Sequence, residues 1–191
     1  MAKATSEQKL KELIKYISAK CADDVNFGKT KLNKILFLCD FLYYKKHQKS
    51  ISEHEYVRLP FGPVPNDFQR ILTNMMGIDI GIAISQSGIY DQEKIFALKK
   101  PDLSIFESDM IAHVDSIIEL VCGNKSLTAT QLSEVTHKTM GWIVTPTSKK
   151  IPYQSIYVKN KKHQVATDWE KSKAKEIATL LAGQYGYPQA S

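Results

Sequence analysis

The segment from Lys29 to His47 constrains the fold more than any other part of the chain, because it is apolar on nearly every side. Apolar residues at helical spacing form one face of it: Leu32, Ile35, Leu36, Cys39, Leu42 and Tyr43. Phe37, Leu38 and Phe41 fill much of the remaining surface. A helix without a wide polar face is buried on most sides. We therefore expect the rest of the chain to pack around this helix.

A single polar stripe runs along the same helix. It consists of Lys29, Asn33, Asp40 and His47, spaced by four, seven and seven residues, with Phe37 and Tyr44 between them. Such a stripe forms an interaction groove or a buried hydrogen-bond network, unless it simply meets water. We expect Lys29 and His47, near the helix ends, to face water. Asp40 lies among aromatic residues, where a buried and paired carboxylate is as consistent with the sequence as an exposed one.

The next segment combines a strand with a rigid loop. Glu55 to Leu59 has the pattern of a short strand, and Gly62-Pro63-Val64-Pro65 follows it. Because the first turn of a helix leaves its amide protons unpaired, proline is tolerated there. We predict a helix that begins near Val64. The free amide groups at its start can bind an acidic or carbonyl group of a partner.

Capping signals and hydrophobic periodicity place the remaining elements. Thr5 with Gln8 and Thr128 with Gln131 predict capping boxes, and three further helical segments are expected at 104–122, 140–144 and 167–181. Ile78, Ile80, Ile82 and Ile84 alternate with small or polar residues, which predicts a half-buried strand. Residues 95–99 supply its hairpin partner.

The order of these elements predicts an α+β fold. We expect a mainly helical single domain of about six helices with a small antiparallel sheet, because the strands cluster between helices rather than alternating with them. The domain is expected to span residues 1–182, followed by a flexible tail at 183–191. The segment from Thr139 to Val165, rich in lysine and proline, suggests irregular surface.

Composition narrows the classes of function. The formal net charge is +6, but only Arg58 and Arg70 are arginines. Since arginine leads in reading bases and phosphates, we do not expect a nucleic-acid partner. We favour a solvated lysine surface as the explanation of this charge, and an acidic protein partner would suit the same charge. Phosphate-binding glycine motifs are absent from the sequence, so we expect no nucleotide cofactor.

The spacing of the three cysteines predicts their chemical state. Cys21, Cys39 and Cys122 match no zinc spacing and are interpreted as buried, reduced thiols. We expect no metal site.

No apolar run reaches the ~18 residues that span a bilayer, and the polar N-terminus lacks an apolar signal core. A cytoplasmic protein without a membrane partner is the expectation.

The strongest candidate for a catalytic site is the pair His137 and Trp142. A histidine at a helix end, five residues before a tryptophan, can be a catalytic base, but the sequence shows no HExxH, GxSxG or Cys-His signature. The structural alternative is a histidine that bonds to backbone while the tryptophan packs. We favour that alternative, so no catalytic residue is assigned.

Two blocks of the sequence resemble a known family. The first is Lys31-Leu32-Asn33-Lys34-Ile35-Leu36-Phe37, then Asp40-Phe41, Tyr56 and Phe61-Gly62-Pro63-Val64-Pro65; the second is Leu132 to His137 followed by Trp142. Together they resemble the Panacea domain, also called the SocA-like antitoxin domain, over roughly residues 8–145. The resemblance implies a mostly helical bacterial, phage or prophage protein that binds and blocks the toxin encoded by the adjacent gene. It also implies links to phage defence and, in some relatives, delivery of a toxin to a cellular protease.

These observations lead to a non-catalytic toxin-binding module as the main hypothesis. Its expected partner-binding residues are Asn33, Asp40, Tyr44, Tyr56, Phe61, Gly62, Pro63, Val64 and Pro65, with His137 and Trp142 as structural or functional candidates. One alternative is a hydrolase-like enzyme that uses His137 with Asp40 or a threonine, which requires these groups to converge in one pocket. Another is a nucleic-acid-binding phage accessory protein.

Overall fold

The computed structural model describes residues 4–87, 90–123, 126–158, 172 and 176. The chain divides into two units, residues 1–159 and 160–191, and the first is described below. The predicted helix at 167–181 and the predicted boundary at residue 182 fall largely or wholly outside the described residues.

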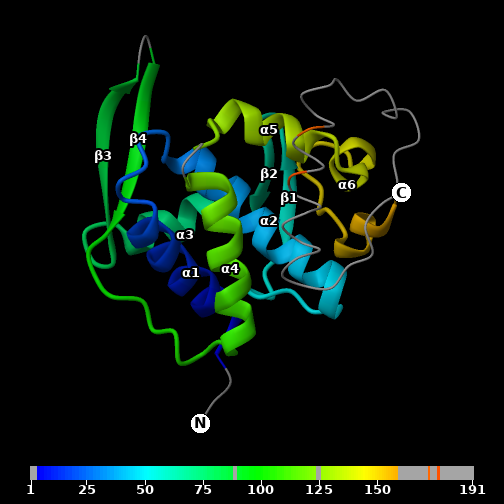
Figure 1. The fold of residues 1–191 in the computed structure, drawn as a ribbon, viewed down its shortest axis with the longest axis horizontal. Coiled ribbons are helices and arrows are strands. Elements are labelled where there is room, and N and C mark those ends of the chain that lie inside the picture. Colours follow the sequence, from blue (N-terminus) through cyan, green and yellow to red (C-terminus); the bar gives the residue numbers. More distant parts are fainter. Residues whose placement is uncertain (1–3, 88–89, 124–125, 159–171, 173–175, 177–191) are drawn as a thin grey trace. The chain divides into compact units, whose positions relative to one another are not determined.

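The first unit is mainly helical, with two small antiparallel sheets (Figure 1). Its elements in chain order are α1 (Ser6–Lys20), α2 (Lys29–His47), β1 (Tyr56–Leu59), β2 (Gly62–Pro65), α3 (Phe68–Met75), β3 (Ile80–Ser87), β4 (Tyr90–Ala97), α4 (Ser108–Cys122), α5 (Ala129–His137), α6 (Met140–Val144) and a 3-10 helix, η1 (Tyr153–Tyr157). The α+β class and the helix-rich composition are confirmed. The single predicted sheet is in fact two separate two-stranded sheets.

Helix α2 lies at the centre of the unit, as its all-round apolar character predicted. It packs against α1, α4, α5, β2, β4 and η1, and nearly all of its residues from Lys31 to Phe41 are buried. Both capping boxes are formed: the Thr5 and Thr128 hydroxyls accept from the backbone of Gln8 and Gln131, whose side chains bond back. These local signals fix where α1 and α5 begin.

The segment from Gly62 to Pro65 is a strand, so the predicted helix start near Val64 is wrong. It pairs antiparallel with β1, with Leu59 opposite Gly62 and Tyr56 opposite Pro65. Proline suits an edge strand as well as a helix start, since it offers no amide proton to either. The Asn66 amide bonds to the Glu55 carbonyl at 2.7 Å, and α3 begins only after it. The free helix amides expected at Val64 are therefore absent from this place.

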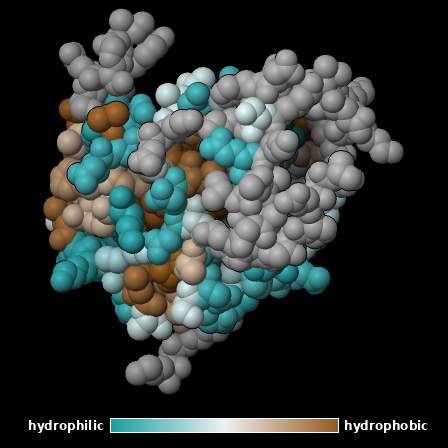
Figure 2. All heavy atoms as spheres, in the orientation of Figure 1, coloured by the Kyte–Doolittle hydropathy of each residue, from teal (hydrophilic) through white to brown (hydrophobic). Residues whose placement is uncertain are grey.

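The second hairpin, β3–β4, is longer than predicted, because β4 begins at Tyr90 rather than at the predicted residue 95. Its base packs on the core through Ile80 and Ile95, whereas Ile84 and Phe96 remain exposed. The Phe96 ring lies over Gly81 on the neighbouring strand, where a Cβ would meet it at 2.2 Å. Apolar residues gather at the left-hand edge of Figure 2, over this hairpin.

Residues 146–158 pack on the core of the first unit rather than forming irregular surface alone. The amide of Ile151 bonds to the Tyr56 carbonyl at 2.8 Å, and Arg58 bonds to the backbone of Ser148 and Lys149, so this segment covers the open edge of β1. Tyr153 then stacks on Phe41 of α2, with 4.5 Å between ring centroids. No periodic pattern in the sequence predicts these contacts.

The Asp40 carboxylate ties α2 to the chain that leads into β1. It is fully buried and accepts hydrogen bonds from the Ser52 amide (2.8 Å), the Ser52 hydroxyl and the Tyr56 hydroxyl (2.8 Å). Burial raises the pKa of Asp40, and the bonds from Ser52 and Tyr56 oppose that rise. The buried and paired alternative for Asp40 is therefore the one that the structure shows.

Replacing Asp40 by alanine is expected to lower the free energy of unfolding by about 2–4 kcal/mol, because Ser52 and Tyr56 then keep buried donors without an acceptor. Urea denaturation followed by circular dichroism measures the change. Asp23→Ala is the control, since Asp23 is exposed and the substitution should leave the midpoint nearly unchanged. Equal midpoints for Asp40→Ala and the native protein would contradict this role for the carboxylate.

Candidate partner-binding site

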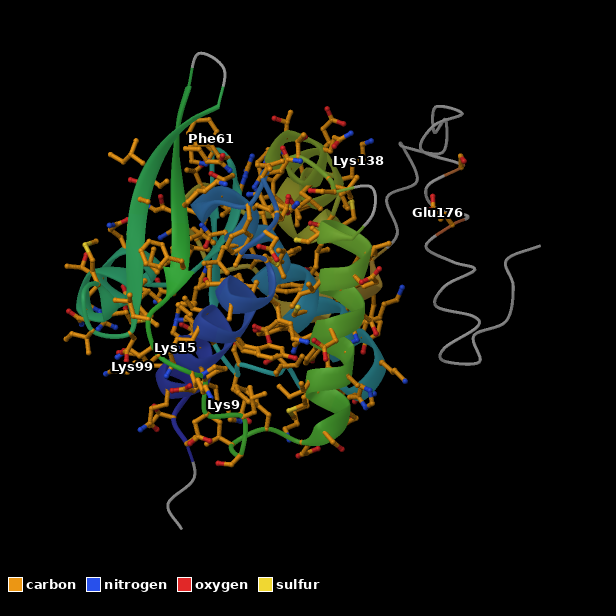
Figure 3. The ribbon with its side chains drawn as sticks, turned by 60° about the vertical axis from the view of Figure 1, so that its left-hand side comes forward. Lys9, Lys15, Phe61, Lys99, Lys138 and Glu176 are labelled. Atoms are coloured by element: carbon orange, nitrogen blue, oxygen red, sulfur yellow. The ribbon has the colours of Figure 1, made fainter. Side chains whose placement is uncertain are left out.

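The turn between β1 and β2 presents an aromatic side chain to solvent. Pro60 and Phe61 form the turn, and Phe61 is 80% exposed although residues on both sides of it pair in the hairpin. Gly62 follows with φ +114°, a backbone conformation that side-chain-bearing residues rarely adopt. Figure 3 places Phe61 at the same end of the unit as Lys138, just beyond α5. The hairpin thus fixes an exposed phenyl ring on a well-defined backbone.

A buried lysine of α2 holds this turn from below. The Lys34 side chain is 1% exposed, and its ammonium group donates a short hydrogen bond to the Phe61 carbonyl. A Cβ on Gly62 would lie 2.1 Å from Lys34 Nζ, so any other residue at this position would displace the amine. Among the described residues no carboxylate pairs with Lys34. Burial accordingly lowers its pKa from 10.5 to about 8.

His137 and Trp142 reach the same turn from α5 and α6. Their rings stack with centroids 4.0 Å apart and planes at 14°, and His137 Nε2 would lie 3.2 Å from a Gly62 Cβ. The Trp142 indole donates to the Leu59 carbonyl at 3.3 Å. The Arg58 guanidinium lies 4.4 Å from the Trp142 ring centroid and donates to the Thr145 carbonyl. Both sequence blocks that carry the family resemblance therefore converge on one turn.

The electrostatics of this cluster are cationic. Burial lowers the pKa of His137, and the charges of Lys34 and Arg58 lower it further, against a smaller opposing effect of the Phe61 carbonyl. His137 Nε2 is buried and has no hydrogen-bond partner of acceptable geometry in the described part of the chain. The His137 ring therefore packs on tryptophan beside two cationic side chains, which disfavour its protonation.

The expected partner-binding residues separate into a contact group and a supporting group. Phe61 is exposed, and Tyr44, Val64, His137 and Trp142 are partly exposed. The others are buried: Asn33, Asp40, Tyr56, Gly62, Pro63 and Pro65. The buried residues offer little surface to a partner in this conformation. The sequence indicates all of these residues, but it does not indicate that Lys34 supports the turn or that Arg58 lies beside Trp142.

The convergence that a hydrolase requires is not found among the described residues. Asp40 bonds to Ser52 and Tyr56 rather than to His137. The Thr136 and Thr139 hydroxyls donate to backbone carbonyls. Within the same part of the chain, no cluster of three acidic, histidine or cysteine residues could hold a metal ion. None of the helices described here has the length and apolar character needed to cross a membrane.

A comparison with models of known protein families finds one match. A family model described as "Antitoxin SocA-like, Panacea domain" matches residues 32–143. No curated protein matches the chain. The matched region runs from α2 through α6 and contains Lys34, the Phe61 turn, His137 and Trp142. Because the match covers more than half of the chain, the protein belongs to the SocA-like antitoxin family with a Panacea domain.

Gly62→Ala is expected to cost about 1–3 kcal/mol of unfolding free energy, because the new methyl group meets Lys34 Nζ and the backbone is strained. Gly77→Ala is the matched control. Its φ is +74°, but nothing lies within 4 Å of the added carbon, so only backbone strain of about 1 kcal/mol applies. Urea denaturation of both variants, alone and with Lys34→Ala, measures the coupling. Equal costs for the two glycine variants, with no coupling to Lys34, would refute the crowding.

Lys34→Met is expected to raise the pKa of His137, because it removes a positive charge that disfavours the imidazolium. The side-chain length is retained, which limits repacking. NMR titration of the histidine ring protons measures the shift. His113, whose burial lowers its pKa to about 4, serves as the internal control and should not move. An unchanged His137 titration would show that Lys34 does not act on it.

Proposed function

We propose that this protein is an antitoxin that neutralises a cognate toxin by direct protein–protein binding. Membership of the SocA-like antitoxin family supports the class. The observation that carries the proposal for the binding site is Phe61, an exposed aromatic residue held on a rigid turn where both family blocks meet. Large exposed aromatic side chains on ordered backbone are typical anchors of protein interfaces.

The proposed mechanism is occlusion. Phe61 enters an apolar recess of the toxin, while Val64, His137, Trp142 and Tyr44 surround it and exclude water. The turn is already ordered by Lys34 and by the β1–β2 pairing, so little conformational freedom is lost on binding. The toxin is held with its active site covered, and the antitoxin performs no chemistry.

The partner is expected to be the product of the adjacent gene. The excess of lysine over acidic residues suits an acidic toxin surface. A phage or prophage origin, a role in phage defence and delivery of the toxin to a cellular protease belong to the same proposal. These three parts of the proposal are supported only by the resemblance to the family.

Co-expression tests the proposal. The neighbouring gene expressed alone should stop growth, and co-expression with this protein should restore it. Phe61→Ala should weaken binding by about 30-fold or more, because an interface anchor is worth about 2 kcal/mol or more. Val25→Ala is the matched control, since Val25 is 72% exposed on a loop before α2. Copurification and isothermal titration calorimetry measure binding.

Two outcomes would contradict different parts of the proposal. A neighbour that is harmless alone, or a pair that never copurifies, refutes the antitoxin function with that partner. Normal neutralisation by Phe61→Ala, with unchanged affinity, keeps the function but refutes this binding site. Thermal unfolding of Phe61→Ala should match that of the native protein, because the lost ring is solvent-exposed.

A further inference from the structure

Two cysteines that are far apart in the sequence meet in the fold. Cys21 follows the last residue of α1, and Cys122 is the last residue of α4. Their sulfur atoms lie 3.2 Å apart, and both are free thiols. The sequence predicted buried, reduced thiols. Cys21 is buried, whereas Cys122 is partly exposed, and the two sulfur atoms are in contact.

The geometry requires little movement to join them. A disulfide bond is about 2.05 Å long, so the two sulfur atoms need to approach by roughly 1 Å. Each residue lies where a helix ends, so this shift does not distort the middle of either helix. The third cysteine, Cys39, is buried on α2, and no contact with another cysteine is found for it among the described residues.

The surroundings control how the pair reacts. Cys122 interacts with the Asp24 carboxylate, which is paired with the fully buried Lys31 ammonium at 2.5 Å. Contact with Cys21 and burial raise the pKa of the Cys122 thiol, and the nearby Lys31 charge opposes that rise only in part. Since the thiolate is the reactive form, oxidation at neutral pH is expected to be slow and to need excess oxidant.

We propose that Cys21 and Cys122 form an oxidative modification site that a hydroperoxide converts into an intramolecular disulfide. The partly exposed Cys122 thiol first loses its proton, and the thiolate attacks the peroxide. The O–O bond breaks, Cys122 becomes a sulfenic acid, and the leaving oxygen takes up the proton and departs as an alcohol or water. The Cys21 thiol then attacks the sulfenic sulfur and expels water. The sulfur pair loses two electrons and two protons in total, and the peroxide gains them.

The disulfide would link the end of α1 to the end of α4. Both helices flank the central α2, so the bond closes a loop of about 100 residues that includes α2 and the Phe61 turn. Constraining so long a loop disfavours the unfolded chain. The Cys21 position precedes the matched family region, residues 32–143. The pair is therefore a property of this chain that the family match does not assign, and it is independent of toxin binding.

Treatment of the reduced full-length protein with excess hydrogen peroxide tests the proposal. The count of free thiols should fall from three to one, the intact mass should drop by two hydrogens, and peptide mapping should join Cys21 to Cys122. The thermal midpoint should rise by several degrees, and a reductant should reverse each change. Cys39→Ala should behave like the native protein, whereas Cys122→Ser should form no crosslink and show no reversible rise.

Three outcomes would overturn the proposal: oxygen addition without a crosslink, a crosslink that involves Cys39, or dimers joined through disulfides. The mass and mapping of the native chain decide between them even where a variant folds poorly. Cys122→Ala provides a second substitution at the same position. A crosslink that forms but leaves the thermal midpoint unchanged would refute the stabilising effect.

Discussion

The buried position of α2 is the constraint on which the rest of the structure depends. A helix that is apolar around most of its circumference must be covered by other elements, and α1, α4, α5, β2, β4 and η1 all pack on it. Two of its buried polar side chains then bind neighbouring segments of the chain. Asp40 binds the chain before β1, and Lys34 binds the turn after it. The helix thereby fixes both ends of the strand β1.

On the proposed function, the same arrangement explains how the described part of the chain holds one exposed aromatic side chain in place for a partner. Buried groups of α2, α5 and α6 determine where the β1–β2 turn lies, while the side chain that leaves the turn, Phe61, contributes little to the core. Exposed residues around the turn can therefore vary between proteins without loss of the fold.

Much of the fold follows from local sequence signals. The bounds of α2 and the capping of α1 and α5 follow from periodicity and from the Thr5 and Thr128 capping boxes. The segment Gly62 to Pro65 was misjudged because proline is compatible with both a helix start and an edge strand. Pairing with β1 decides between them, and that pairing depends on residues several positions away. Local rules alone do not contain this information.

The candidate site could be predicted in its members but not in its organisation. The family blocks identified Phe61, His137 and Trp142, whereas the roles of Lys34, Arg58 and the segment after Thr145 arise from contacts between distant parts of the chain. The approach of Cys21 to Cys122 is of the same kind, since 101 positions separate the two residues. Contacts of this sort leave no spacing pattern in a single sequence.

Hydrogen–deuterium exchange of the protein with and without its purified toxin tests the central claim most directly. If the Phe61 turn is the binding surface, exchange should slow in peptides covering residues 57–66 and 134–145. Exchange in the exposed half of the β3–β4 hairpin should remain unchanged. Protection confined to that hairpin, with no change around Phe61, would contradict the account.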